Sequence, residues 1–244
     1  MKILALDSSG LVASVALIED ENMIAEYTVN YKKTHSQTLL SMLDEIVKMT
    51  DTDLNTVDII AVAGGPGSFT GLRIGSATAK GLGLALDKPL ISVPTVEGLA
   101  YNLYHTSGLI CPIMDARRNQ VYTGIYEFVE GEFKVIMDQV ATGIEDIIDI
   151  LNKQDKSVVF LGDGVPVYKN IIQDTLKVSY NFAPAHVNKQ RAGAIGARAF
   201  DYLKMNKIEN ARDYKPDYLR LSQAEREMKE KIAKEAAGQD NVHH

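Results

Sequence analysis

The stretch VAGGPGSFTGLRIGSATAKGLGLAL at residues 62–86 decides the fold of this 244-residue chain. It starts at the end of an apolar run, DIIAVA at 58–63, which predicts a buried parallel strand. The turn GGPGS at 64–68 leads into a long helix rich in small residues, and LISV at 90–93 predicts the next strand. Another helix is expected over 95–104. This strand–helix–strand order is typical of parallel strands in an α/β sheet.

The segments on either side extend this unit into two similar halves. Before it, strands are predicted at 2–7, 13–18 and 23–30, followed by a helix through Met49 with Thr34 as N-cap and Gln37 completing a capping box. After it, strands are predicted at 109–115, 120–129, 132–138 and 157–162, and helices at 144–153, 166–177 and 191–205. The repeated order β-β-β-α-β-α-β-α predicts an α/β fold with mixed sheets of the actin-like, ribonuclease-H-like ASKHA kind, in which two lobes flank a cleft.

The expected division follows from the same order. Residues 1–106 are assigned to an N-terminal lobe, 107–222 to a C-terminal lobe, and 223–244 to a charged tail. The tail contains a candidate polar helix, Glu225 to Ala237, whose simplest interpretation is a solvated segment.

Composition narrows the classes of function. Apolar residues make up 45% of the chain and predict a sizeable core, while the net charge is −6. Since phosphate neutralisation supplies most of the affinity of RNA-binding proteins, so acidic a chain is not expected to be the main RNA-binding element. The single cysteine, Cys111, excludes an internal disulfide and is expected to be a buried, inert thiol. Residues 74–94 contain three charges and predict no membrane span, so the expected location is the cytoplasm.

Polar residues and glycines follow several predicted strands and form a candidate anion site. Helix N-termini at such turns attract anions, and Arg117 and Arg118 after another strand offer contacts to a phosphate or a carboxylate. The glycine turn nevertheless matches neither GxxxxGKS/T nor GxGxxG and contains no lysine. Two interpretations stay open: a residual nucleotide or anion site, and turns that simply require glycine, Asp and Ser. The candidate residues are Asp7, Ser8, Ser9, Gly67, Ser68, Gly162, Asp163 and Gly164.

Small residues repeat every four positions along the helix that follows the glycine turn. Glycine inside a helix costs roughly 1 kcal/mol relative to alanine, so such a stripe indicates close approach of another element. The element is either the preceding helix, 36–49, or another subunit, and the apolar surplus on both helices favours a subunit contact. We therefore predict that Gly75 and Ala79 lie at or just beneath such an interface. The predicted interface comprises Leu39, Leu40, Leu43, Ile46, Val47, Gly71, Ile74, Gly75, Ala79, Leu82 and Gly83.

A set of motifs spread over most of the chain resembles the TsaB (YeaZ-type) family. The motifs are ALDSSG at 5–10, HSQTLL at 35–40, GPGSFTGLRIG at 65–75, MDARRNQVYTGIY at 114–126, GDGV at 162–165 and PDYLR at 216–220. The resemblance implies a non-catalytic scaffold subunit required for threonylcarbamoyl modification of N6 of adenosine 37 in tRNA. It implies binding to the catalytic relative TsaD through the N-terminal lobe, together with the ATPase TsaE, and only indirect contact with tRNA. The predicted interface would also let the isolated chain form homodimers.

The same resemblance locates a difference from the catalytic relative. TsaD carries an HxxxH metal-binding pair just after the strand that corresponds to 90–93, and here Thr95 and Leu99 occupy those two positions. Leucine has no donor atom and threonine is a poor ligand for transition metals, so no metal or other cofactor is expected. His35, beside a predicted helix cap, is interpreted as a surface or capping residue. The alternatives are a metal-dependent transferase or peptidase-like enzyme, and an ATP-dependent kinase of the same superfold.

Overall fold

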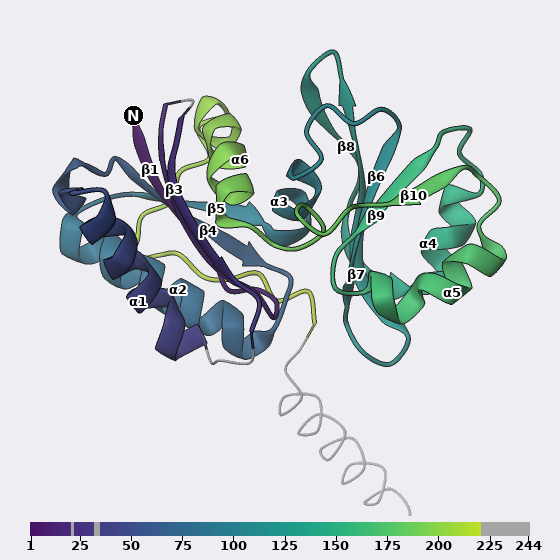
Figure 1. The fold of residues 1–244 in the computed structure, drawn as a ribbon, viewed down its shortest axis with the longest axis horizontal. Helices are drawn as coiled ribbons and strands as arrows, with labels where there is room; N and C mark the ends of the chain where they lie inside the picture. The colour runs from purple at the N-terminus through teal and green to yellow at the C-terminus, as the bar shows by residue number, and fades with distance from the viewer. Residues whose placement is uncertain (21, 32–34, 221–244) are drawn as a thin grey trace, which may run out of the picture.

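The computed structural model describes residues 1–20, 22–31 and 35–220, in which two five-stranded mixed sheets stand side by side (Figure 1). The first sheet has the order β3-β2-β1-β4-β5, formed by β1 (Lys2–Asp7), β2 (Ala13–Glu19), β3 (Asn22–Val29), β4 (Ile59–Gly65) and β5 (Leu90–Pro94). The second has the order β8-β7-β6-β9-β10, formed by β6 (Leu109–Asp115), β7 (Gln120–Val129), β8 (Glu132–Gly143), β9 (Val158–Leu161) and β10 (Tyr180–Phe182). Each sheet joins an antiparallel meander to two parallel strands, which confirms the predicted duplication.

Helices cover both faces of each sheet. They are α1 (His35–Met49), α2 (Phe69–Leu86), α3 (Thr95–Tyr101), α4 (Ile144–Leu151), α5 (Val165–Thr175) and α6 (Ala192–Lys204), with a short 3₁₀ turn η1 at Leu54–Thr56. Side chains alternate along β1, so that Leu4 and Leu6 pack under α1 and α2, while Ile3 and Ala5 pack under α6. In the second sheet, Cys111 and Ile113 of β6 face α4 and α5.

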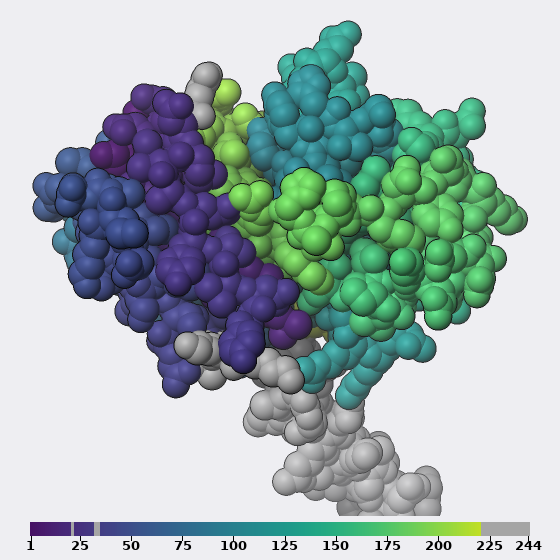
Figure 2. Space-filling model, in the orientation of Figure 1, coloured from purple at the N-terminus to yellow at the C-terminus, as the bar shows by residue number. Residues whose placement is uncertain are grey.

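The two halves exchange helices, and this corrects the predicted division at residue 106. Helix α6 follows the second sheet in sequence but packs on the first, where Ile195 and Ala199 join its core. Helix α3 precedes the second sheet but packs Leu99 against it. Figure 2 shows the light-green segment that contains α6 filling the space between the two lobes. Residues 107–220 therefore do not form a lobe by themselves, because the inner face of each sheet is apolar and is covered by a helix from the other half.

The small-residue stripe of α2 faces the interior of the first lobe, which is the intramolecular one of its two expected partners, and the subunit interface stays a prediction. A Cβ atom at Gly75 would crowd Ser8 Oγ, and one at Gly83 would lie 2.8 Å from Cβ of Ala211. Ala79 is completely buried in the core. Among the predicted interface residues of α1, Leu39, Leu43 and Ile46 are also buried and Val47 is partly buried, which leaves Leu40 exposed. The periodicity identified a packed row, and within this chain that row packs against its own lobe.

Some expectations fall outside the described residues, namely the Thr34 cap and the tail helix at 225–237. Within the described part of the chain, no helix has both the length and the apolarity needed to cross a bilayer. Cys111 is fully buried with its Sγ 3.4 Å from Thr123 Oγ1, and burial raises the pKa of its thiol to about 12. The prediction of an inert cysteine is therefore confirmed.

Asp7 ends β1 as a carboxylate in the buried layer, with 1% of its surface exposed. Its Oδ1 accepts hydrogen bonds from the backbone N–H of Ser9 at 2.9 Å and from Ser9 Oγ at 2.6 Å. Burial dominates over these two bonds and raises the pKa of Asp7 to about 6. The side chain is a buried cap of the β1–β2 turn, not a solvent-side one.

Because the small-residue stripe faces the core, substitutions on the two sides of α2 are expected to differ in their effect on stability. Ala79→Arg places a charge in the closed core and is expected to lower the free energy of unfolding by at least about 3 kcal/mol or to prevent folding. Ala77→Arg, on the exposed side of the same helix, is the matched control and should unfold like the wild-type chain. Urea denaturation followed by circular dichroism measures both. Equal stability of the two variants would show that the stripe faces solvent.

The pKa of Asp7 predicts a pH dependence of stability. Because its folded-state pKa lies above the unfolded value, ionisation opposes folding: the cost is absent below about pH 4 and complete above about pH 6. Asp7→Asn keeps an acceptor for Ser9 without a charge, so it should raise the free energy of unfolding at pH 8 by up to about 3 kcal/mol, at roughly 1.4 kcal/mol per pKa unit. The gain should shrink as the pH falls through 6 towards 4. Denaturation curves with the same pH dependence for both proteins would contradict this.

Candidate functional site

The β1–β2 turn and the N-terminus of α2 are locked together at one edge of the first sheet. Ser8 Oγ donates a hydrogen bond to the carbonyl oxygen of Gly71 at 2.8 Å, and the Ser9 carbonyl oxygen accepts one from the Ser68 N–H at 2.6 Å. A Cβ atom on Gly67 would overlap that same Ser9 carbonyl oxygen. Glycine is needed at this position because the two backbone segments approach closely. This agrees with the interpretation that the turn simply requires glycine.

Ser68 is the N-cap of α2. The positive end of the helix dipole therefore faces the space between the lobes. Its Oγ accepts a hydrogen bond from the Gly71 N–H at 3.3 Å. Neither the Phe69 nor the Thr70 N–H has an intrahelical acceptor, as is usual in the first turn of a helix. This helix end could therefore accept an anion, although the described residues of the first lobe that line the cavity include no lysine or arginine.

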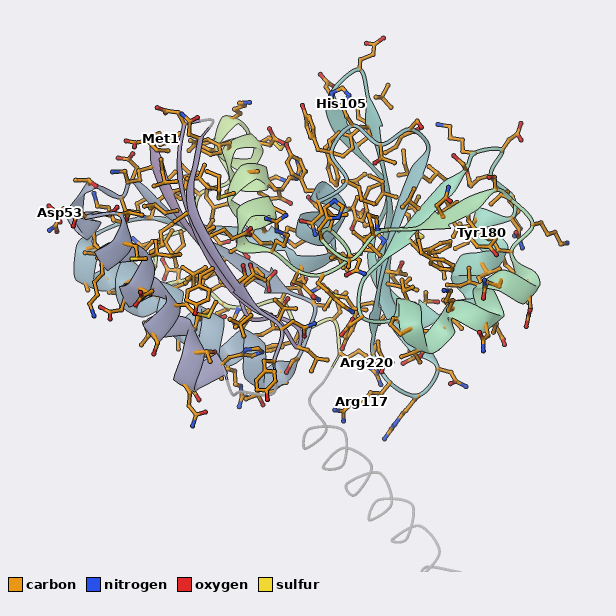
Figure 3. All side chains as sticks on the ribbon, viewed as in Figure 1. Met1, Asp53, His105, Arg117, Tyr180 and Arg220 are labelled. Carbon is orange, nitrogen blue, oxygen red and sulfur yellow. The ribbon has the colours of Figure 1, made fainter. Side chains whose placement is uncertain are left out.

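A cavity of about 590 Å³ lies between the lobes in front of this helix end. The first lobe contributes the β1–β2 turn, His35 and residues 66–70 with Leu72, and the second contributes 114–117, Tyr122 and Asp163. Residues 217–220, from the end of the described chain, form a third part of the wall. Figure 3 shows Arg117 and Arg220 close together where the lobes meet.

The second-lobe wall carries carboxylates as well as arginine. Asp115 Oδ1 accepts hydrogen bonds from the Arg117 N–H at 2.9 Å and from Tyr168 Oη at 3.3 Å. Burial raises the pKa of Asp163, whose Oδ1 also accepts a bond from the Asp115 N–H. Arg117, Arg118 and Asn119 all have φ near +60°, an unfavourable conformation that turns the chain sharply between β6 and β7. Such mixed charges fit a phosphate group poorly, because the carboxylates would repel it.

The predicted anion-site residues gather in one region, although half of them do not reach the cavity. Ser9, Gly67, Ser68 and Asp163 line it, whereas Asp7, Ser8, Gly162 and Gly164 lie behind the wall. Gly162 has φ +110°, and a Cβ there would overlap the carbonyl oxygen of Ile113. Glycine at that position serves strand packing.

Several residues that line the cavity were not assigned to it from sequence. His35 lies at the start of α1 with Nε2 2.8 Å from the Gly10 carbonyl oxygen, and its buried Nδ1 has no partner among the described residues. Phe69 stacks on Tyr218 with ring centroids 4.4 Å apart. The motif PDYLR was visible in the sequence, but nothing in it indicated that Tyr218 and Arg220 return to the cleft.

The two positions that replace the expected metal ligands have structural contacts instead. Thr95 Oγ1 accepts a hydrogen bond from the Gly65 N–H at 3.2 Å, and Leu99 is 1% exposed in the core between α3 and the second sheet. Between them, Glu97 forms a buried ion pair with Arg198 of α6, with 2.9 Å between Oε2 and Nη2. No group of three or more His, Cys, Asp or Glu side chains among the described residues is arranged to hold a metal ion.

Comparison with known proteins gives consistent results over almost the whole chain. The family model described as "TsaD: tRNA N6-adenosine threonylcarbamoyltransferase" matches residues 22–228. The tRNA threonylcarbamoyladenosine biosynthesis protein TsaB of Bacillus subtilis is 35% identical over 225 residues, which cover 92% of this chain and 96% of that protein. The protein of the same name from Haemophilus influenzae is 30% identical, with coverage of 90% and 94%.

A solved structure agrees with these relatives. The structure of a Pseudomonas aeruginosa protein with similarity to peptidase YeaZ superposes with a TM-score of 0.76 at 25% identity, covering 90% of this chain and 99% of that one. The duplicated actin-like fold and the motifs from Ala5 to Arg220 are thus those of one group of proteins. The chain belongs to the TsaB (YeaZ) family of tRNA threonylcarbamoyladenosine biosynthesis proteins.

Proposed function

We propose that this chain acts in tRNA threonylcarbamoyladenosine biosynthesis as a non-catalytic subunit that binds and supports a TsaD-type transferase. In this proposal the transferase modifies N6 of adenosine 37, an ATPase of the TsaE type completes the assembly, and this chain contacts tRNA only indirectly. The family establishes the pathway, while the division of labour is inferred from the residues of this chain.

The observation that carries the non-catalytic role is the chemistry of α3. Thr95 is engaged with the Gly65 N–H and Leu99 is enclosed in the core, so neither position offers a nitrogen or thiolate ligand. The nearest carboxylate on the helix, Glu97, is already paired with Arg198. The positions where the resemblance places metal ligands are thus occupied by a buried leucine and by a threonine that is already hydrogen-bonded.

The surface that best suits a partner lobe lies on the outer side of α2. A Cβ atom added to Gly81 would meet nothing within 4 Å, and Ala77 and Ala85, four residues to either side, are also exposed. This second row of small residues permits another helix to approach closely. Large apolar side chains flank it: Leu84 is 52% exposed and Leu40 of α1 is 56% exposed.

We propose the exposed row of Ala77, Gly81 and Ala85, in place of the buried stripe, as the docking surface. Helices α1 and α2 lie side by side on the outer face of the first sheet (Figure 1), so the exposed row and Leu40 belong to one face of the lobe. A partner with a related lobe can present the same pair of helices, which gives a pseudo-symmetric four-helix contact. The same geometry supports a homodimer when the partner is absent.

A substitution on the exposed row tests this surface. Ala77→Arg leaves the core untouched but inserts a long charged side chain between the docked helices, so it should weaken binding to TsaD at least about tenfold. Ala185→Arg, an exposed alanine of the second lobe, is the control and should bind normally. Co-purification and isothermal titration with TsaD measure the affinity. Wild-type affinity in a folded Ala77→Arg protein would place the interface elsewhere.

The non-catalytic role has its own test. The purified chain should retain no stoichiometric zinc or iron after dialysis and should transfer no threonylcarbamoyl group to tRNA without TsaD, because no ligand pair is available on α3. Elemental analysis and a tRNA modification assay, each with and without TsaD, provide the readings. One tightly held equivalent of either metal would refute the proposal.

A further inference from the structure

The C-terminal segment 206–220 packs on the first lobe through specific hydrogen bonds. The N–H and C=O of Glu209 pair with those of Leu90. Lys80 Nζ on α2 donates to the carbonyl oxygens of Arg212 and Tyr214 at 2.9 and 3.0 Å. Tyr214 is 1% exposed, so the segment is anchored along α2 before it reaches the cleft.

Beyond Tyr214 the segment crosses from the first lobe to the second. The Asp217 N–H donates to the Gly64 carbonyl oxygen at 2.7 Å, while its carboxylate accepts a bond from Gln139 Nε2 of β8 at 3.0 Å. Arg220 Nη1 donates to the carbonyl oxygen of Ala116, just after β6, at 2.6 Å. These two bonds connect the lobes directly along one wall of the cavity.

The lobes are joined a second time at α3 and α6. Arg198 of α6 is 4% exposed, pairs with Glu97 of α3, and lies with its guanidinium carbon 4.5 Å from the ring centroid of Phe133 on β8. Gly98 permits this contact, since a Cβ there would overlap Ile195. Figures 1 and 3 show α6 and Arg220 at opposite ends of the boundary between the lobes.

We propose that residues 217–220 are a latch that sets how far the lobes open about the α3–α6 contact. The α3–α6 contact is apolar, ion-paired and buried, so it is the fixed side. The latch consists of two polar bonds at the partly exposed side, where water can replace them. The Phe69–Tyr218 stack holds the latch on the first lobe, so release separates it from Ala116 and Gln139 and opens the cavity on that side.

The latch differs from the partner surface and does not depend on the proposed function. Its bonds lie on one flank of the cleft, whereas the exposed small-residue row lies on the outer side of α2. A charge-assisted bond such as that of Arg220 is strong enough to shift an open–closed equilibrium roughly tenfold or more.

The test measures the distance between the lobes in the full chain. Spin labels on Ser41→Cys of α1 and Gln173→Cys of α5 report it by double electron–electron resonance, since both positions are exposed and Cys111 is buried. Arg220→Ala and, from the other lobe, Gln139→Ala are expected to broaden the distribution towards longer distances. Arg212→Ala is the matched control, because Arg212 is exposed and, among the described residues, bonds through its backbone alone: its N–H donates to Asn210 Oδ1 and its carbonyl oxygen accepts from Lys80.

The outcomes show whether residues 217–220 control the opening of the lobes or have no effect on it. A new long-distance population in both latch variants, with circular dichroism and cooperative melting like those of the control, supports the latch. Distributions that superpose on the wild type in folded Arg220→Ala and Gln139→Ala proteins overturn it. Should Arg220→Ala fail to fold, Gln139→Ala decides the question, because it removes a bond to the latch without altering the segment itself.

Discussion

The placement of α2 at the cleft between the lobes depends on how closely the backbone of the β1–β2 turn approaches this helix. The carbonyl oxygens of Ser8 and Ser9 occupy the space where side chains at Gly71 and Gly67 would be, and Ser9 accepts the bond from the Ser68 N–H. Each glycine inside the helix costs roughly 1 kcal/mol in helix stability. Core packing of Ala79 and the bond from Ser8 Oγ offset this cost and fix the N-terminus of α2 at the cleft.

Once α2 is fixed, two other features follow. Its inner side anchors the returning C-terminal segment through Lys80 and Gly83, and its outer side stays free with Gly81 in open space. The cleft in front of its N-terminus is then bounded by three parts of the chain that are distant in sequence. The exchange of α3 and α6 makes these parts interdependent, because the inner face of each sheet is covered by a helix from the other half.

The element order could be read from sequence because strand and helix periodicities are local. The direction in which a helix row faces is not local. Helix α2 contains two rows of small residues, one at Gly71, Gly75, Ala79 and Gly83 and another at Ala77, Gly81 and Ala85, and periodicity alone does not tell which row meets the sheet. The same limit applies to α6, because its apolar periodicity does not tell which of the two sheets it covers. The site was half predictable: glycine, Asp and Ser at strand ends marked the region, but the return of Tyr218 to Phe69 leaves no periodic signal.

The contacts of Thr95 and Leu99 show what these two positions do in this chain. Thr95 satisfies the N–H of Gly65 at the turn that precedes α2, and Leu99 fills the core between α3 and the second sheet beside Gly162. Two histidines at these positions would leave a buried N–H without its acceptor and force an imidazole into an apolar core, each costing roughly 1–3 kcal/mol. The side chains at these two positions are therefore part of how α3 is held between the lobes. Thr95 supports the turn before α2 and Leu99 the packing of α3 on the second sheet, and neither side chain supplies a nitrogen or thiolate ligand.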